Sequence, residues 1–490
     1  MKNNPDGLFF TGLRSGMGTN MKNMTLWNIA RACKGKLVVP AGKSAGSCPK
    51  AGMAVIRGFT GKEAGRIVLD SRKVEPGDVF IATKGERVDG HDFINEVFEK
   101  GAIGVVCEKE PEPLTGPCIR VEDSFAALRN IASFYREQMP VPVVGITGSV
   151  GKTSTKEFVA AVLAQKYKTH KTQGNFNNEV GVPLTLLAMP EDTEAAVVEM
   201  GINHFGEMHR LSEMVRPDIC VMTNIGQCHL EFLGSRDGIL KAKSEIFDCM
   251  NPEGSVCVNG DDDKLAMIQE VHGKKPLRFG FSPENDIYAD NIVNRGLLGS
   301  TAQIHADGEV FEADIPLPGS HMVLNALAAT AVGKLLGLTS DQIAAGIAGV
   351  QAVSGRSRVI SAKDKVLIDD CYNANPVSTK AAIDLLALAD GRKVAVLGDM
   401  FELGENEKEL HAQVGEYAAE HGVDCLYCAG ALSEAMYSAA KNAGIAEAEH
   451  FSDTEALLAA LPGLLRAGDS VLVKASHGMG YDKIIEQLDR

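Results

Sequence analysis

Short apolar runs alternate with helix-like segments along most of the chain, and this alternation predicts an α/β fold with parallel sheets. Four candidate strands in the central part span residues 141–146, 195–200, 219–224 and 255–259. Four more span residues 366–369, 393–397, 425–428 and 470–473. Parallel strands joined by helices form right-handed crossovers and present ligands at the carboxyl ends of the strands. We therefore expect a functional site at those ends.

Changes in the pattern divide the 490 residues into an extension and three domains, in keeping with a chain too long for one core. Residues 1–23 are polar and glycine-rich without a period, and we expect a disordered extension. A small α/β domain is expected over residues 24–140. The central domain, 141–350, includes a β-rich hairpin region before a helix. The last domain, 351–490, repeats the alternation and is expected to be doubly wound.

Composition limits the partners. The formal net charge of −15 argues against nucleic acid, which basic surfaces bind. The chain has no run of eighteen apolar residues that could indicate a membrane span. Its first residues lack the order of a secretory signal, which is basic residues followed by an apolar run. Eleven scattered cysteines are typical of reduced thiols, so we expect a cytoplasmic protein. The pair Cys425 and Cys428 lies in an apolar run, which favours strand packing over redox or metal chemistry.

A glycine-rich turn follows the first central strand, with the sequence TGSVGKTS from Thr147 to Ser154. Glycines let backbone N–H groups face phosphate oxygens, and the following helix adds the positive end of its dipole. We expect Lys152 to reach the terminal phosphates and Thr153 to hold Mg²⁺. The spacing departs from the common pattern, because Ile146 stands where a glycine is expected. A turn that binds nothing is the alternative; we favour ATP or GTP binding by Gly148, Ser149, Val150, Gly151, Lys152, Thr153 and Ser154.

Three further residues are candidates for chemistry, although each has a simpler reading. Glu199 ends a predicted strand, where a carboxylate can hold Mg²⁺ or merely face solvent. His229 lies in a loop after the next strand, where histidines are more often structural. Lys243 lies on an amphipathic helix, where a solvated lysine is the usual reading. A lysine of lowered pKa can also add CO₂ and become an anionic carbamate ligand.

These motifs together resemble the Mur ligase superfamily, the ATP-dependent amide-bond formers of bacterial wall precursor synthesis. The likeness includes TGSVGKT, the strand-end glutamate, HLEFLGS at 229–235 and AKSEIF at 242–247, and it runs from about Met24 to the end. It implies three domains: a small α/β N-terminal domain, a central parallel-sheet ATPase domain with the phosphate loop, and a Rossmann-like C-terminal domain.

Four longer runs resemble the branch of that superfamily that joins D-alanyl-D-alanine to UDP-N-acetylmuramoyl-tripeptide. They span residues 172–187, 321–329, 368–378 and 396–404. This resemblance implies that both molecules are substrates, that the reaction passes through an acyl phosphate, and that the protein is a cytoplasmic monomer. The alternatives are another amino-acid ligase of the superfamily or a folylpolyglutamate synthase. A nucleotide switch without ligase chemistry fits the metal-site residues less well.

The resemblance also implies roles for individual residues around ATP. Thr153 and Glu199 would hold one Mg²⁺, and His229 with a carbamylated Lys243 would hold a second. Lys152, Glu199, His229, Lys243 and Arg356 form the expected catalytic set. Asn325 would lie near the adenine, Asp370 near the ribose, and Arg356 at the phosphates, with Arg358 as the alternative arginine. Asp369 is expected to be strand-end structure.

Other residues would hold the two substrates that are joined. Ser71, Arg72, Lys84 and Gly85 resemble loops that grip a UDP-sugar, and Asn175, Asn177 and Asn178 resemble a loop at its peptide arm. The residues expected at the dipeptide are Asn373, Asn375, Lys474 and Ser476. Asparagines at such places also form turns. The run KASHGMG at 474–480 departs from the familiar KGSR form, with Ala475 for glycine and His477 for arginine.

Overall fold

A computed structural model describes residues 21–40, 61–85 and 88–489, so the predicted extension lies almost wholly outside the described residues. The chain forms two compact units. Unit 1 comprises Met1–Val141, Phe176–Thr193 and Glu213–Val215; unit 2 comprises Pro142–Asn175, Glu194–Ser212 and Arg216–Arg490. Within the described residues, every helix is too short or too polar to span a lipid bilayer. The α/β fold with three sheets is confirmed; the domain boundaries stay a prediction.

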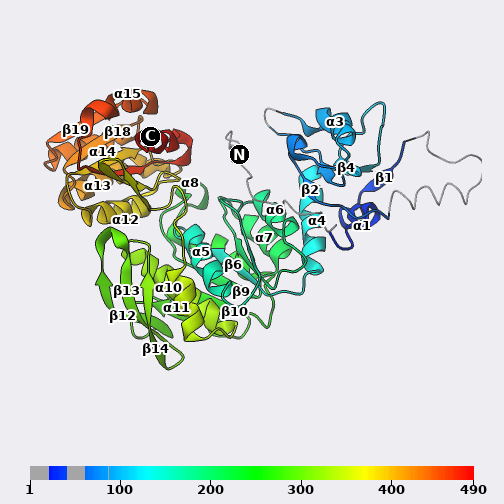
Figure 1. Ribbon diagram of the computed structural model, residues 1–490, viewed down its shortest axis with the longest axis horizontal. Helices are drawn as coiled ribbons and strands as arrows, with labels where there is room; N and C mark the ends of the chain where they lie inside the picture. Colours follow the sequence, from blue (N-terminus) through cyan, green and yellow to red (C-terminus); the bar gives the residue numbers. More distant parts are fainter. Residues whose placement is uncertain (1–20, 41–60, 86–87, 490) are drawn as a thin grey trace, which may run out of the picture. The chain divides into compact units, whose positions relative to one another are not determined.

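Unit 1 contains a five-stranded sheet in the order β1-β5-β4-β3-β2 (Figure 1). Its strands are β1 (Lys36–Val38), β2 (Ile67–Val68), β3 (Val79–Ile81), β4 (Gly104–Cys107) and β5 (Cys118–Arg120). Only β1 is antiparallel to its neighbour among these pairs. The helices α1 (Leu26–Ala32), α3 (Ile94–Glu99) and α4 (Ser124–Glu137) accompany it, with 3₁₀ turns η1 (Ser71–Lys73) and η2 (Gly90–Phe93).

A segment from the middle of the sequence completes unit 1. Helix α6 (Gly181–Leu187) packs beside α4, and the Tyr135 hydroxyl of α4 donates to the carbonyl of Met189 at 2.8 Å. Arg136 of α4, itself buried, donates from Nε to the carbonyl of Val215 at 2.9 Å. Because buried carbonyls need partners, these bonds fix the inserted segment to the first domain.

The larger sheet of unit 2 has nine strands in the order β14-β13-β12-β11-β10-β9-β6-β8-β7. The strands are β6 (Val143–Thr147), β7 (Thr169–Lys171), β8 (Ala195–Glu199), β9 (Ile219–Met222), β10 (Ser255–Asn259), β11 (Leu277–Gly280), β12 (Ile287–Asn294), β13 (Ser300–Ala306) and β14 (Glu309–Ile315). Strands β6–β12 pair in parallel, whereas β13 and β14 form the predicted antiparallel hairpin region.

Helices cover this sheet with a continuous apolar core. The helices of the region are α5 (Lys152–Leu163), α7 (Glu207–Val215), α8 (Leu230–Leu233), α9 (Arg236–Ser244), α10 (Ser320–Leu335) and α11 (Ser340–Ala348). Phe158 of α5, Leu327 of α10 and Ile343 of α11 belong to one buried cluster with strand residues such as Val144. Helix α10 is apolar on almost every side, as expected of a helix buried within a domain.

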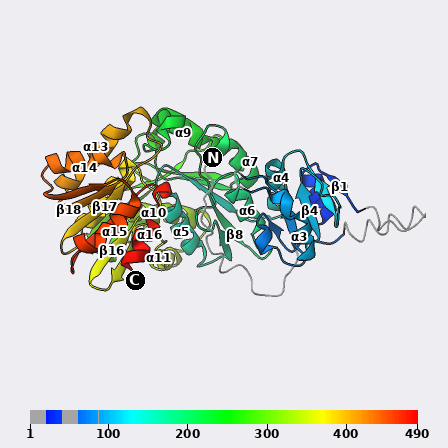
Figure 2. The ribbon, with the colours of Figure 1, turned by 90° about the horizontal axis from the view of Figure 1, so that it is seen from above.

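The six-stranded sheet of unit 2 has the order β15-β16-β20-β17-β18-β19. Its strands are β15 (Arg358–Ala362), β16 (Lys365–Asp369), β17 (Lys393–Gly398), β18 (Cys425–Ala429), β19 (Glu447–Phe451) and β20 (Ser470–Lys474). Figure 2 shows α13 (Glu407–Glu420) and α14 (Ser433–Asn442) on one side, and α15 (Thr454–Leu464) and α16 (Asp482–Leu488) on the other. Helix α12 (Pro376–Ala387) shares the core of α13 and α14. The doubly wound prediction is confirmed.

Successive residues of these strands face opposite cores, as the period of a strand requires. Ala395 and Leu397 of β17 face the core of α13 and α14, whereas Val394 and Val396 face the core of α15 and α16. In β18, Cys428 and Cys425 follow the same rule, are both buried and form no disulfide. The prediction that this cysteine pair packs a strand is confirmed.

Candidate functional site

The glycine-rich turn links β6 to α5 as the sequence predicts. Gly148 has φ +152° and Gly151 has φ +85°, and Lys152 begins the helix. A Cβ on Gly148 would lie 1.9 Å from Thr223 Oγ1, so this position accepts no side chain. Both glycines are therefore required for the loop, which leaves the amino end of α5 open to bind an anion.

The segment after β9 holds the loop in shape. The Thr223 hydroxyl donates to the Val150 carbonyl at 2.6 Å, and the Asn224 amide both accepts from Val150 N at 2.9 Å and donates to its carbonyl at 3.0 Å. Gly226 N donates to Ser149 Oγ at 2.9 Å. Sequence reasoning missed these residues. The sequence does carry a signal for them, because Thr223 and Asn224 form a polar pair directly after β9, the strand next to β6 in the sheet.

Lys152 is partly buried and lies against the loop that precedes it. Its Nζ donates to the Gly148 carbonyl at 2.9 Å and to the Ser149 carbonyl at 3.4 Å. Burial lowers the pKa of Lys152; Glu199 opposes this shift, and the positive charge of Arg356 adds to it. The structure therefore brings Lys152 near both Glu199 and Arg356, as the predicted catalytic set requires.

Thr153 and Glu199 face each other. The Thr153 hydroxyl donates to Glu199 Oε1 at 3.2 Å, and Glu199 lies fully buried at the end of β8. Lys156, one turn along α5, was missed by sequence reasoning: its side chain is 1% exposed and its Nζ lies 3.9 Å from Glu199 Oε2. A hydroxyl and a carboxylate at this spacing form the oxygen-rich set that Mg²⁺ prefers.

The other two predicted metal ligands lie in different surroundings. Lys243 in α9 is fully buried, and its Nζ has no hydrogen-bond partner among the described residues. Burial lowers the pKa of Lys243 to about 8, with Lys152 adding to the shift and Cys228 opposing it. His229 has φ +52°, and its Nδ1 lies 2.6 Å from Glu402 Oε2. In the described ranges, no three His, Cys, Asp or Glu side chains are grouped to hold a metal.

Asn325 lies beside the phosphate loop rather than in solvent. Its Oδ1 accepts from the Thr155 hydroxyl at 2.8 Å and would lie 3.5 Å from a Cβ on Gly151. Asn325 is 5% exposed, so its amide does not face water. Its predicted place near the adenine stays a prediction.

Arg356 lies in the loop before β15, with its Cζ 3.9 Å from the centroid of the Tyr372 ring. The alternative, Arg358, is the first residue of β15 and is paired in register with Asp369. Asp369 itself accepts from Gly355 N at 2.8 Å, which agrees with its expected structural role. The geometry therefore favours Arg356 as the arginine that approaches the phosphate loop.

Among the predicted ribose and dipeptide residues, Asp370, Lys474 and Ser476 are buried, whereas Asn373 is exposed. Lys474 Nζ donates to Asp370 Oδ2 at 2.5 Å and to the Asn373 carbonyl at 2.8 Å, and Asp370 also accepts from Ser357 N at 2.9 Å. Asn375 caps α12 by accepting from Ser378 N, so it has the turn role that asparagine often takes. The Ser476 hydroxyl accepts from Phe401 N at 2.9 Å and keeps its own proton to donate.

The predicted sugar-nucleotide residues lie mainly in unit 1. Ser71 and Arg72 belong to η1, which Asp70 caps, and the Arg72 side chain is 81% exposed with its guanidinium against Asp70. Lys84 forms an isolated bridge with Asp89, and Gly85 N donates to the Val88 carbonyl. Asn178 accepts from Val180 N and Gly181 N, which begins α6. Asn177 also lies in unit 1, whereas Asn175 ends a segment of unit 2.

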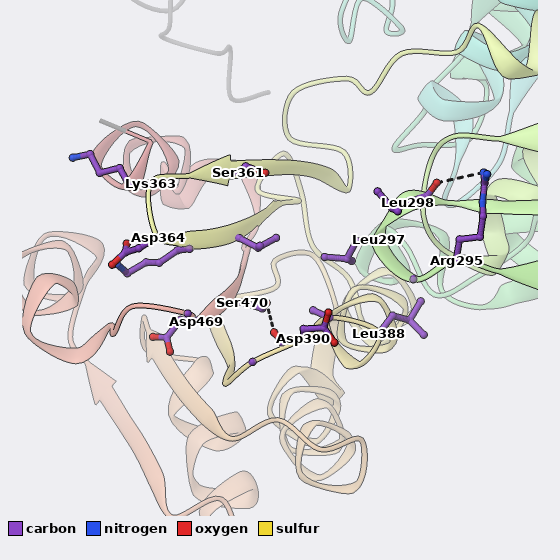
Figure 3. A pocket seen from close by; sticks show the side chains of 16 residues that line it. Arg295, Leu297, Leu298, Ser361, Lys363, Asp364, Leu388, Asp390, Asp469 and Ser470 are labelled. Carbon is purple, nitrogen blue, oxygen red and sulfur yellow. Dashed lines mark hydrogen bonds and ion pairs between the residues drawn. The ribbon is translucent and has the colours of Figure 1, made fainter.

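A cavity of about 610 Å³ lies elsewhere in unit 2 (Figure 3). It is lined by the starts of β16 and β20, by the residues after α12, and by the 3₁₀ turn η5 (Gly296–Leu298). The carboxyl ends of these strands, with Asp370 and Lys474, lie at the other end of the sheet. Four of its six charged residues form ion pairs: Lys365 with Asp364, Asp469 with Arg392, and Arg295 with Asp314. We do not include it in the candidate site.

A glycine loop between a buried parallel strand and a helix, with a lysine, a threonine and a strand-end carboxylate, defines a phosphate-loop nucleotide-binding protein. The chain matches the Mur ligase middle domain over residues 146–333, the Mur ligase glutamate ligase domain over residues 355–477, and the Mur ligase family catalytic domain over residues 65–136. The chain belongs to the Mur ligase family.

Similar proteins are known in full length. The UDP-N-acetylmuramoyl-tripeptide–D-alanyl-D-alanine ligase of Bacillus subtilis is 36% identical over 474 residues, which cover 96% of this chain and 99% of that protein. A crystal structure of MurF from Acinetobacter baumannii has a TM-score of 0.84 at 31% identity and covers 96% of this chain and 100% of that one. The MurF ligase of Thermotoga maritima in complex with ADP has a TM-score of 0.76 at 32% identity, covering 86% and 97%.

Proposed function

We propose that this protein is an ATP-dependent ligase that joins D-alanyl-D-alanine to UDP-N-acetylmuramoyl-tripeptide in the cytoplasm. The observation that carries this proposal is the phosphate loop with Lys152 near both Glu199 and Arg356, in a chain similar to such ligases over nearly its whole length. A carboxylate and an amine do not condense in water without activation, and the arrangement at the loop suits that activation.

The reaction has two steps. The terminal carboxylate of the tripeptide attacks the γ-phosphorus of ATP, ADP leaves, and an acyl phosphate forms. The amino nitrogen of D-alanyl-D-alanine then attacks the acyl carbon and loses a proton, and phosphate leaves as the amide bond forms. Repulsion between the anionic carboxylate and the phosphoryl oxygens is the main obstacle. Lys152 and Arg356 lie where their positive charges would reduce it.

The donor sets support two Mg²⁺ ions. The facing oxygens of Thr153 and Glu199 fit the first, and bound Mg²⁺ would neutralise charge on the phosphates. Lys243 as an amine offers no oxygen, but a carbamate on its Nζ would supply two. A buried Nζ without a hydrogen-bond partner, with a pKa lowered to about 8, supports carbamylation because CO₂ adds to the uncharged amine. His229 with Lys243 would complete the second site.

We propose that the remaining residues bind different parts of the substrates. Ser71, Arg72, Lys84 and Gly85 of unit 1 would bind the UDP-sugar, with Asn175, Asn177 and Asn178 at its peptide arm. Asn325 would lie near the adenine of ATP. The buried Asp370 and Lys474 form one ion pair, so we propose that together they shape the surface between the ribose and the dipeptide, with Asn373, Asn375 and Ser476 nearby.

Phosphate release tests the function. Wild-type protein with ATP and Mg²⁺ should release phosphate only when UDP-N-acetylmuramoyl-tripeptide and D-alanyl-D-alanine are both present. Lys152→Ala should lower the rate by on the order of 10²–10³ while thermal unfolding is unchanged. The matched control is Lys241→Ala, an exposed lysine on α9, which should behave as wild type. Phosphate release with a single amino acid or a folate in place of the dipeptide would refute the substrate assignment.

A further inference from the structure

Tyr372, between β16 and α12, contacts three residues of the site from different segments. The guanidinium carbon of Arg356 lies 3.9 Å from its ring centroid. The ring of His477 lies 5.4 Å away at an interplanar angle of 35°. Its hydroxyl lies near the side chain of Asn175, which follows β7 of the nine-stranded sheet. None of the roles proposed above uses this tyrosine.

The backbone around Tyr372 is fixed against the loop that carries Arg356. Tyr372 N donates to the Gly355 carbonyl at 3.2 Å, and a Cβ on Gly355 would lie 3.0 Å from the Cβ of Tyr372. Gly355 has φ +74°, which suits glycine alone, so the loop lies directly against the tyrosine. On the other side of Arg356, Ser357 N donates to Asp370. The backbone hydrogen bonds and the Tyr372 ring therefore both fix the position of Arg356.

A guanidinium stacked on an aromatic ring keeps its N–H groups free in its own plane. The ring fixes the long side chain without using any of its donors, which remain available for phosphate oxygens. The positive charge of Arg356 also acts on Lys152, so the guanidinium lies near the phosphate loop. An arginine without this support would lose orientation when it approaches a phosphate.

We propose that Tyr372 is a positioning residue for the ligase reaction: its ring orients Arg356 toward the phosphate loop, and its hydroxyl connects that orientation to Asn175. The inference rests on the proposed function, because it assumes that Arg356 acts on ATP phosphates. It implies that the orientation of Arg356 at the phosphate loop depends on Asn175. Tyr372 acts through Arg356 and does not touch the reacting atoms.

A double-mutant cycle tests the ring. Tyr372→Leu should lower kcat about tenfold with little change in KM for D-alanyl-D-alanine, whereas Tyr372→Phe keeps the ring and should stay within about threefold of wild type. In an Arg356→Ala background, Tyr372→Leu should have no further effect. An equal loss in both backgrounds, or equal losses for the leucine and phenylalanine variants, would overturn the proposal.

A second pair of variants tests the hydroxyl. Tyr372→Phe should cause a small loss in the wild-type background and no further loss in an Asn175→Ala background, whatever Asn175→Ala itself costs at the peptide arm. Tyr437→Leu is the matched control, because Tyr437 also lies near a lysine and a histidine, Lys441 at 5.3 Å and His450 at 6.1 Å, but on α14. It should leave kcat unchanged. Additive losses for Tyr372→Phe and Asn175→Ala would rule out the connection.

Binding of a non-hydrolysable ATP analogue separates this inference from the function it rests on. Titration calorimetry should show that Tyr372→Leu weakens binding of the analogue about tenfold when Arg356 is present. In the Arg356→Ala background, Tyr372→Leu should leave the affinity for the analogue unchanged. If wild-type protein ligates nothing, the proposed function fails, and analogue binding still decides the role of Tyr372. If ligation occurs and both cycles are additive, the function stands and the positioning role is wrong. Thermal unfolding of each variant identifies any loss of fold.

Discussion

Three lysines of the site, Lys243 and Lys474 buried and Lys152 partly buried, differ in how their charge is accommodated. Lys474 is paired with a carboxylate at 2.5 Å, Lys152 donates to loop carbonyls, and Lys243 has no hydrogen-bond partner among the described residues. A buried charge is costly unless it is paired, and burial lowers the pKa of the unpaired Lys243 to about 8. The chemistry assigned to each lysine agrees with its surroundings.

The Asp370–Lys474 pair should matter for stability as well as for the site. Lys474→Met would leave a buried carboxylate without its cation, which should destabilise the protein by about 3–5 kcal/mol. Calorimetric unfolding measures the loss, with Lys365→Met as the control, since Lys365 forms a pair with the half-exposed Asp364. That control should change stability little. A loss for Lys474→Met no larger than for Lys365→Met would show that the buried pair does not hold the strand ends together.

At the scale of elements, the strands that the sequence predicted are those buried on both faces. The strands that it missed include β7, β15 and β19, and each lies at the edge of its sheet. Edge strands are half-exposed and carry polar residues, as in Thr169–Lys171, so they form no apolar run that a reader of the sequence would notice. The prediction of secondary structure from apolar runs is limited by this difference in burial.

The same contrast holds for the site. The phosphate loop was predictable because its residues are adjacent in sequence and their spacing has a direct physical reason. The pairing of Asp370 with Lys474 and the contact of Tyr372 with Asn175 join residues far apart in the chain. No local pattern specifies such contacts; they follow from strand order, which places the ends of β16 and β20 side by side.

Strand β18 offers a test of cysteine chemistry. Burial raises the pKa of Cys425 to about 11 and that of Cys428 further. Alkylation requires the thiolate, and at pH 8 roughly one Cys425 in a thousand would carry it. Among the ten cysteines that the structure describes, we expect iodoacetamide to label the partly exposed Cys249 first in native protein, as peptide mass mapping would show. Labelling of Cys425 should increase as the pH rises toward 11.

Unfolded protein is the control for this experiment, because all eleven cysteines should then react at similar rates. If native protein at pH 7 were labelled at Cys425 or Cys428 as fast as at Cys249, the two cysteines would not be strand packing. The pair would then have to be reconsidered as a reactive site.

At the scale of the whole molecule, the chain passes between the two units several times. It leaves unit 2 after Asn175, forms α6 in unit 1, and returns at Glu194. The loop proposed for the peptide arm therefore has Asn175 in one unit and Asn178 in the other. The residues proposed to bind the UDP-sugar belong to unit 1, whereas the phosphate loop belongs to unit 2.

Because these two sets of residues belong to different units, we predict that mutation can separate binding of the sugar nucleotide from binding of ATP. Arg72→Ala in unit 1 should weaken UDP-N-acetylmuramoyl-tripeptide binding by about tenfold, because a charged hydrogen bond is lost, and should leave binding of an ATP analogue unchanged. Lys152→Ala should do the reverse. Arg120→Ala is the control, since Arg120 lies in the same unit with only a long 3.6 Å contact to Glu110. Titration calorimetry with each ligand gives all six affinities. If Lys152→Ala weakened the sugar nucleotide as much as Arg72→Ala did, the two units would not bind their ligands independently.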